Sequence, residues 1–368
     1  MTARLVLESM KHQPMRSLLS ALLIGVPVTL ILALVGLSHG MLEDAAERTR
    51  GVGADVIVRP KGSSLLSLRG GIPQKFVDYF LKQPHVRAAV GVLMQPAEGV
   101  TMMITGLDLP KYTAALGGFK YAYGGPLRKP GDILIDEYYA RQKNARVGSR
   151  IKVLNREWQV AGIIQSGQLA HLVVDLRVLQ EMMSAADQDQ VNSIFLKLDN
   201  PANTDEVKRE LEADPHLEEW PIYSTEELAS AWTPDNLPGL NAFIYVVMGI
   251  GVVIGFFVVS LSMYMAVLQR TREIGILKSL GASKSFILRI ILVEAFLLGV
   301  GGTVVGIVLS FGANYLIGAL VPASIQMKIV PTWWPIAGGI TMVGAILGAL
   351  GPGLSAAASD PIEALAYE

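Results

Sequence analysis

The chain has 368 residues, of which 51% are hydrophobic and 17% charged. Soluble globular proteins carry about 25% charged residues, so this composition predicts that part of the chain lies in lipid. The formal net charge of -1 argues against a nucleic-acid-binding protein, and the absence of cysteine excludes disulfides, thiolate metal sites and cysteine nucleophiles.

Four apolar stretches are long enough to cross a bilayer as helices. The first has no charged residue between Arg16 and Glu43, the third has a single charge at Glu294 from Ile290 onward, and the second and fourth have none. About 20 apolar residues cross the roughly 30 Å hydrocarbon core, where a helix satisfies its own backbone hydrogen bonds. The first stretch is too long for a cleaved secretory signal, and we interpret it as a retained anchor. We predict transmembrane helices at 17–40, 239–269, 285–320 and 333–354.

Basic residues in the short flanks predict the orientation. Three precede the first span and five separate the second apolar stretch from the third, whereas the connection between the third and fourth contains only Lys328. Because loops rich in Lys and Arg stay in the cytoplasm, we expect both termini there. The remaining segments are then a cytoplasmic amphipathic helix at 1–16, an outward domain at 41–238, a cytoplasmic helix at 270–284, an outward loop at 321–332 and a cytoplasmic tail at 355–368.

The outward segment is predicted to be a two-lobed α+β domain. Its two ends alternate strand-like and helical patterns, with strands expected at 54–58, 88–93, 100–105 and 193–198 and helices at 73–81 and 204–213. Its centre has short strand-like runs separated by turn residues, at 132–135, 150–154 and 159–164. We expect one lobe to be assembled from both ends of the segment and the other to be inserted between them.

No catalytic or metal-binding constellation is recognisable. The five histidines have no partner at ligand spacing, and the chain contains neither H-E-x-x-H nor the phosphate-binding G-x-x-x-x-G-K-[ST] loop. We therefore expect no catalytic residue, no metal and no bound cofactor in this chain. A membrane-bound protease or other enzyme has little support.

Small residues recur at four-residue spacing in the apolar stretches, which predicts close helix packing. The sets are Gly36 and Gly40; Gly251 and Gly255; Gly302, Gly306 and Ser310; Gly344 and Gly348. We select Gly251 and Gly255 as candidate packing positions between two copies of the chain. The alternative is that glycine is simply common in membrane helices.

A candidate substrate-side loop lies early in the outward domain. Its apolar residues, flanked by glycines, are Leu65, Leu66, Leu68 and Ile72. A flexible apolar loop would suit a lipidic or amphiphilic cargo. The alternative is that these residues form a buried segment.

The segment 269–283, QRTREIGILKSLGAS, combines a dense basic cluster with helical spacing and is expected to continue the second span. If it is helical, Arg270 can pair with Glu273, and one apolar strip is formed by Ile276, Leu277 and Leu280. Two interpretations stay open: a solvated cytoplasmic loop, or a helix that docks in a partner's groove.

Three residues that follow have predicted local roles. Gly281 is a natural helix stop, and Ser283 can cap the next helix. Glu294 lies about a turn and a half into the third span, and an acid at that depth is a functional candidate by default. Interfacial snorkelling or a structural hydrogen bond is an equal alternative, and we assign no proton transfer to it.

The motif REIGILKSLGAS, followed by FILRIILVEAFLLGVGGTVVGIVLS, resembles the signature of FtsX-like permeases, the MacB and LolC/LolE type of ABC transporter. The N-terminal MKHQPMRSLLSALLIGV and the C-terminal AASDPIEALAYE resemble motifs of the same family, although Ala366 stands where the closing motif commonly has Arg. The order of one span, a large outward domain and three spans matches that architecture over the whole chain.

The resemblance implies an inner-membrane permease subunit joined to two copies of a cytoplasmic ABC ATPase, which would be another polypeptide and would bind ATP and Mg. It also implies a second permease copy, in a homodimer, and a membrane-fusion adaptor or other extracytoplasmic protein as a further candidate partner. Carried over by position, the element that couples to the ATPase is 270–284, with Arg270, Arg272, Glu273, Leu277, Lys278 and Gly281 as its candidate residues.

Two functions are consistent with this resemblance. The first is export or extraction of an amphiphilic or lipidic substrate by mechanotransmission, in which ATP hydrolysis moves the outward domain. The alternative is an FtsX-like regulator that activates an extracytoplasmic cell-wall hydrolase and transports nothing. Both share every motif described above, and we place transport first because the two-lobed domain looks more like the MacB type.

Overall fold

The computed structural model describes residues 14–64, 70–98, 102–183, 189–218, 220–320 and 327–359. They fall into two compact units. One, the helical unit, contains the chain up to His39 together with 238–317 and the residues from 327 onward. The other, the large domain, is made mainly of residues 40–237.

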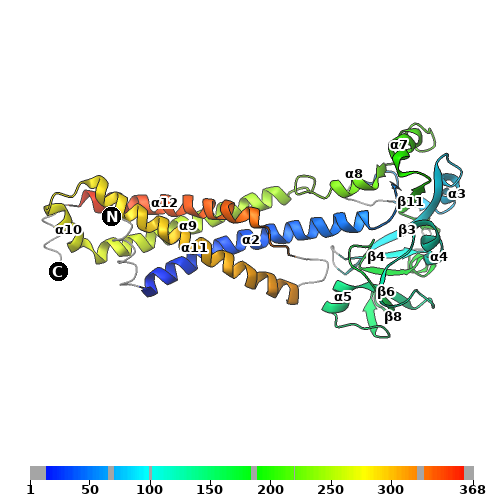
Figure 1. Cartoon of the computed structure of the whole chain (residues 1–368), viewed down its shortest axis with the longest axis horizontal. Coiled ribbons are helices and arrows are strands. Elements are labelled where there is room, and N and C mark those ends of the chain that lie inside the picture. Colours follow the sequence, from blue (N-terminus) through cyan, green and yellow to red (C-terminus); the bar gives the residue numbers. More distant parts are fainter. Residues whose placement is uncertain are drawn as a thin grey trace. The chain divides into compact units, whose positions relative to one another are not determined.

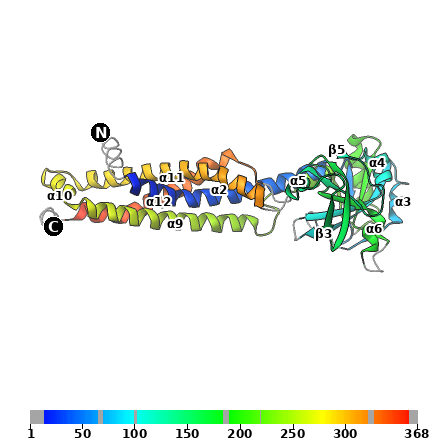
Figure 2. The same ribbon diagram turned by 90° about the horizontal axis from the view of Figure 1, so that it is seen from below.

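Four long helices make up the helical unit and lie side by side in Figures 1 and 2. All four are long and apolar enough to cross a membrane, as the sequence predicts. From Gly40 onward the first helix belongs to the large domain. The elements are α2 (Pro14–Arg50), α9 (Leu240–Gln269), α10 (Thr271–Ser279), α11 (Lys284–Leu320), η2 (Pro331–Trp333) and α12 (Trp334–Ala358).

Glycines at four-residue spacing let the helix backbones touch. A Cβ atom at Gly348 would lie 2.3 Å from the carbonyl oxygen of Phe256, and one at Gly344 would lie 2.8 Å from another α9 carbonyl oxygen. A Cβ at Gly306 of α11 would lie 2.5 Å from the Cβ of Val28 of α2. Such close approach maximises van der Waals contact, which drives helix association where lipid removes the hydrophobic effect. The spacing therefore serves packing within one chain.

Gly251 and Gly255 also pack inside the chain, where both are buried in α9. A Cβ at Gly251 would lie 3.3 Å from Cδ1 of Ile31 in α2, and one at Gly255 would lie 3.9 Å from the carbonyl oxygen of Thr341 in α12. Both glycines thus lie next to helices of the same chain, and the assignment of this pair to an interface between copies stays a prediction.

Replacing Gly348 with Ala is expected to destabilise the helical unit by about 1–3 kcal/mol, because the new methyl group would overlap backbone of α9 that cannot rotate away. Gly351→Ala is the matched control, since a Cβ there meets nothing within 4 Å on the same helix. Unfolding of the purified protein in mixed detergent micelles measures both variants. Equal stability of the two would contradict the close backbone contact.

The large domain is a mixed α/β unit. Its strands are β1 (Val56–Val58), β2 (Ile72–Pro73), β3 (Val86–Glu98), β4 (Met102–Leu107), β5 (Tyr121–Gly124), β6 (Asp132–Asp136), β7 (Arg150–Val153), β8 (Arg156–Ile164), β9 (Leu172–Asp175), β10 (Gln190–Val191), β11 (Ser193–Leu198) and β12 (Ile222–Ser224). Its helices are α3 (Phe76–Phe80), α4 (Leu109–Leu116), α5 (Glu137–Gln142), α6 (Leu176–Glu181), η1 (Pro201–Asn203), α7 (Thr204–Glu212) and α8 (Thr225–Ser230).

One sheet runs through the domain in the order β12-β1-β11-β3-β4-β9-β6-β8-β5, with β7 added to β8. Strands from both ends of the domain make up its first half, and the inserted residues 121–175 make up its second half, as the sequence predicts. The halves join where β4 and β9 pair in parallel. The two predicted lobes are thus continuous through a single sheet.

Both faces of this sheet are covered, because alternate residues of a strand point to opposite sides. Val56 and Val58 belong to one apolar core and Ile57 to the other. The first core also receives side chains from α3, α6 and α7, and the second from α4 and α8. The sheet is therefore a buried layer between helices.

The structure corrects the expected 73–81 helix and one residue of the substrate-side loop. Ile72 and Pro73 form β2, which pairs with β10, and the helix starts only at Phe76. Ile72 is fully buried, so the alternative of a buried segment applies to this residue. The other residues assigned to the loop, Leu65, Leu66 and Leu68, lie outside the described part of the chain.

A buried ionic network fixes the last turns of α2 within the large domain. Arg48 Nε lies 2.8 Å from Asp44 Oδ2, and Arg48 Nη2 lies 2.7 Å from Asp136 Oδ2. His171 Nδ1 lies 2.8 Å from the same Asp136 oxygen. The other Asp136 oxygen, Oδ1, accepts the backbone N–H of Tyr139 at 2.8 Å and caps α5. Asp136 therefore joins α2, β6, α5 and the residue before β9.

The environment of Asp136 favours the ionised form of its carboxyl group. Burial alone raises its pKa, but the hydrogen bond and charge of His171, the charge of Arg48 and the N–H of Tyr139 outweigh burial and hold the pKa below the usual 3.8. A carboxyl whose pKa is lowered by folding stabilises the fold above its unfolded-state pKa, and this contribution disappears as pH falls through the folded-state value. The network is expected to weaken only below about pH 4.

Arg48→Met is expected to destabilise the large domain by about 3–5 kcal/mol near neutral pH, because it leaves a carboxylate with no exposed surface next to an apolar group. Arg50→Met, two residues away, is the control. Arg50 pairs with Glu226 at 2.8 Å, but their side chains are 49% and 70% exposed, so about 1 kcal/mol or less is expected. Chemical denaturation followed by near-ultraviolet circular dichroism measures the free energy of unfolding of both variants. Equal losses of stability in the two variants would contradict the role of Arg48 as partner of Asp136. A loss in Arg48→Met that stays as large below pH 4 would contradict it as well.

Candidate functional site

The segment expected to continue the second span is a separate short helix. At Arg270 the backbone leaves the helical region, with φ −113° and ψ 14°, so α9 ends at Gln269 and α10 begins at Thr271. The segment thus follows the second span as expected, but with a break in the helix at the boundary between 239–269 and 270–284. Gly281 ends the turn after α10 with φ +94°, a conformation suited to glycine, as predicted.

The next helix, α11, begins as the sequence predicts. Ser283 Oγ accepts the backbone N–H of Phe286 at 3.3 Å, which is the contact of a helix N-cap. The turn between α10 and α11 is therefore closed by a glycine on one side and a serine cap on the other. The turn therefore fixes where α10 ends and where α11 begins.

One face of α10 packs on the helical unit. Gly275 is buried and Thr271, Ile274 and Lys278 are half-buried, at the three- and four-residue spacing of one helix face. Ile274 contacts the apolar core shared by the long helices. The helix is therefore attached to the helical unit along a stripe of its own surface.

The opposite face of α10 is exposed. Arg272 and Glu273 lie on it, and the predicted apolar strip is exposed by 44% at Ile276, 38% at Leu277 and 80% at Leu280. Apolar side chains bordered by charges are typical of an amphipathic helix that docks in a groove of another protein. Among the predicted coupling residues, Arg272, Glu273 and Leu277 thus face outward.

Arg270 contacts α11 and not its expected partner Glu273. Its Nη1 lies 3.4 Å from Oε2 of Glu294, and the two side chains are only 18% and 4% exposed. Of the alternatives for Glu294, the structure favours a structural contact over snorkelling to a headgroup. The ion pair joins the start of α10 to α11.

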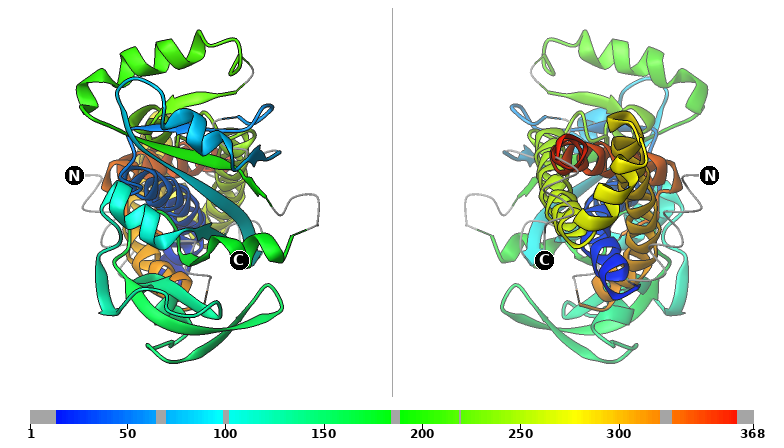
Figure 3. Two further views of the ribbon diagram at one scale, coloured as in Figure 1. Left: turned by 90° about the vertical axis from the view of Figure 1, so that its right-hand side faces the viewer. Right: turned by 90° about the vertical axis from the view of Figure 1, so that its left-hand side faces the viewer.

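Lys278 also faces the protein. Its Nζ donates a hydrogen bond to the carbonyl oxygen of Ala357 at 2.9 Å and another to that of Ser359. These groups lie at the C-terminal end of α12, which Figure 3 shows end-on next to α10 in its right-hand view. The ammonium group of Lys278 thus has partners within the chain, and the assignment of this residue to contact with the ATPase stays a prediction.

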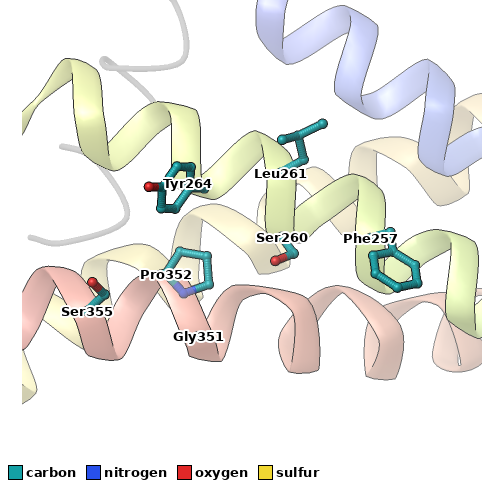
Figure 4. A pocket seen from close by; sticks show the side chains of 7 residues that line it. All are labelled: Phe257, Ser260, Leu261, Tyr264, Gly351, Pro352 and Ser355. Carbon is teal, nitrogen blue, oxygen red and sulfur yellow. The ribbon is translucent and has the colours of Figure 1, made fainter.

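A shallow groove of about 430 Å³ lies between α9 and α12 (Figure 4). It is lined by Phe257, Ser260, Leu261, Tyr264, Gly351, Pro352 and Ser355. The lining contains hydroxyl groups but no carboxylate, imidazole or amine, so it offers no acid–base pair for catalysis. Among the described residues, no group of three or more His, Cys, Asp or Glu side chains is arranged to hold a metal ion.

The sequence contains a match to the G-x-S-x-G pattern of nucleophile elbows, GLSHG at residues 36–40. The structure places it inside α2, whereas an elbow requires a sharp strand–turn–helix connection. Gly36 has a packing role instead, because it accepts the backbone N–H of Lys328 at 2.9 Å and a Cβ would lie 2.4 Å from the Lys328 carbonyl oxygen. The pattern is not a catalytic site here.

Comparison with known proteins places both units in one family. The model of the MacB-like periplasmic core domain matches residues 17–214, more than half of the chain. The model of the FtsX-like permease C-terminal region matches residues 245–360. The first match covers α2 and most of the large domain, and the second covers α10 and the helices around it.

Relatives of known sequence agree with these matches. The chain is 28% identical over 238 residues to an uncharacterized ABC transporter permease of Methanocaldococcus jannaschii, covering 61% of this chain and 59% of the relative. It is 30% identical over 226 residues to the uncharacterized ABC transporter permease YknZ of Bacillus subtilis, covering 60% and 55%. It is 25% identical over 398 residues to the macrolide export ATP-binding/permease protein MacB of Nitrobacter winogradskyi, covering 99% and 60%.

The chain thus spans less than two thirds of the length of each of these three relatives. Its four apolar helices, with a mixed α/β extracytoplasmic domain before the second of them, agree with the order of the two family matches. The chain belongs to the FtsX-like permeases with a MacB-like periplasmic core domain, a family of multi-pass ABC transporter permeases.

Proposed function

We propose that this chain is the membrane subunit of an ABC exporter, in which a separate ATPase drives movement of the large domain. The observation that carries the proposal is the exposed apolar face of α10. This face is available for docking of another protein, and the other face of the same helix packs on the helical unit. ATP and Mg would bind to the partner, and the chain itself would contribute no catalytic group. Two copies of the ATPase would bind a pair of permease subunits.

The orientation that fits this function has both termini and α10 in the cytoplasm and the large domain outside the inner membrane. The basic residues on both sides of α10, including Arg272 and Lys284, support it, since such residues are retained on the cytoplasmic side. In this orientation α10 meets the compartment that contains ATP.

A second copy of the permease is part of the proposal. In α9 only 22% of the most apolar window is buried, compared with 39–50% in the other three long helices. This helix therefore has the largest surface left for lipid or for another copy, and its exposed residues include Phe257 and Leu261. The partner copy would be identical in a homodimer; a related permease would make a heterodimer.

We propose an amphiphilic or lipidic substrate, handled outside the bilayer or at its outer leaflet, with a membrane-fusion adaptor as a further partner. The support is the MacB-like domain and the macrolide export named for one relative, MacB of Nitrobacter winogradskyi. The same domain match favours transport over the FtsX-like alternative, activation of a cell-wall hydrolase. Stimulation of ATPase activity by an amphiphile would support transport, whereas a hydrolase retained by the large domain would support regulation.

The double variant Glu273→Lys, Leu277→Ala is expected to weaken binding of the partner ATPase by at least about 30-fold, because it reverses a charge and removes an apolar contact at the centre of the exposed face. Leu316→Ala is the control, since it removes an exposed leucine of α11. Binding is measured with the full chain in nanodiscs and its partner ABC ATPase. Unchanged affinity of the double variant would refute α10 as the docking helix.

A further inference from the structure

The C-terminal end of α12 accepts hydrogen bonds from α10 as well as from the residue that follows α12, since Ser359 Oγ donates to the carbonyl oxygen of Ala356 at 2.9 Å. The last carbonyl groups of any α-helix have no intrahelical N–H to accept, and their partial negative charges favour a nearby cation. In α12 the final residues include Ala356 and Ala357, which are buried in the core that Ile274 of α10 also contacts. These carbonyls therefore have limited access to water.

Lys278 of α10 donates to two further carbonyl oxygens at this end, those of Ala357 and Ser359. A lysine that binds the last carbonyls of its own helix is a common C-terminal cap; here the cap comes from a different helix. The contact therefore joins α10 to α12, although 79 and 81 residues separate the partners.

The other end of α10 is joined to a different helix. Arg270, directly before α10, pairs with Glu294 of α11. Between these two charged contacts, Gly275 and Ile274 pack on the helical unit. The short helix is thus attached at its start to α11 and at its end to α12, while Glu273 between these attachments is exposed.

We propose that Lys278 is a positioning residue that couples α10 to α12, so that a displacement of α10 is delivered to the C-terminal end of α12. The proposed role in energy coupling rests on the proposed function, but the attachment itself does not. Breaking it leaves the docking face intact and lets α10 move without α12. A direct contact with the ATPase would instead make Lys278 part of the docking face.

A distance measurement tests the attachment. Because the natural chain contains no cysteine, spin labels can be placed at Ser279→Cys in α10 and Ser355→Cys in α12, both exposed, without removing other thiols. Lys278→Met keeps the side-chain length but has no donor, so it is expected to broaden the distribution of distances between the two labels. The population in which α10 is attached to α12 is expected to fall about tenfold or more relative to the population in which it is detached. Lys278→Arg retains donors and is expected to keep the narrow distribution.

Lys284→Met is the matched control, because it removes the same charge from an exposed position at the start of α11. It is expected to leave the label distance unchanged. A narrow distribution in Lys278→Met identical to that of the unsubstituted chain would overturn the proposal, since the cap would then not hold α10. A distribution broadened equally by Lys284→Met would also overturn it, because the effect would come from loop charge.

A second measurement separates this proposal from the proposed function. In nanodiscs with the partner ATPase, Lys278→Met is expected to bind the ATPase within about twofold of the unsubstituted chain but to lose at least about tenfold of the substrate-stimulated ATPase activity. Loss of binding as large as in the Glu273 and Leu277 double variant would make Lys278 a docking residue and overturn the positioning role, while the proposed function would stand. Failure of the unsubstituted chain to bind any ATPase would overturn the proposed function, and the label distances would still decide the attachment.

Discussion

Direct contact between helix backbones is the constraint on which the helical unit depends. In lipid the hydrophobic effect does not bring apolar helices together, so their association relies on close packing and on a few polar contacts. At Gly348 and Gly306 the partner helix approaches so closely that a methyl group would overlap it. Such surfaces have one way of fitting, and a helix that is displaced must therefore take its neighbour with it or separate from it.

Polar contacts join the helices in addition to the close glycine contacts. Ser20 Oγ and Ser262 Oγ are 2.8 Å apart and join α2 to α9, while the ion pair of Arg270 and the cap by Lys278 join α10 to α11 and α12. Apolar packing is not directional, whereas a hydrogen bond requires a particular pair of atoms. These contacts therefore add a second constraint on the register that the close glycine contacts already restrict.

The sequence predicted features that depend on local pattern. The length of the four apolar stretches predicted the four long helices correctly. Gly281 and Ser283 predicted the turn between α10 and α11 correctly. The short helices α4, α5, α6 and α8 escaped prediction because each has only six to eight residues, too few for a helical period to stand out. Their shared local signal was a preceding cap residue, in turn Asp108, Asp136, Asp175 and Ser224, directly after or near a strand.

The remaining features could not be predicted because they join residues that are distant in the chain. In the sequence, nothing distinguishes Lys278 from the other basic residues of its segment. Its role becomes visible only in the structure, where the end of α12 lies next to it. Likewise, the spacing of Asp44, Arg48, Asp136 and His171 contains no motif. In both places the charged group contacts a partner from another element; Asp136 and Arg48 are buried, so removing either would leave the other desolvated, whereas Lys278 is half-buried. The same property that hides these contacts from the sequence makes them suited to transmit a displacement, since neither partner can move away without losing its compensation.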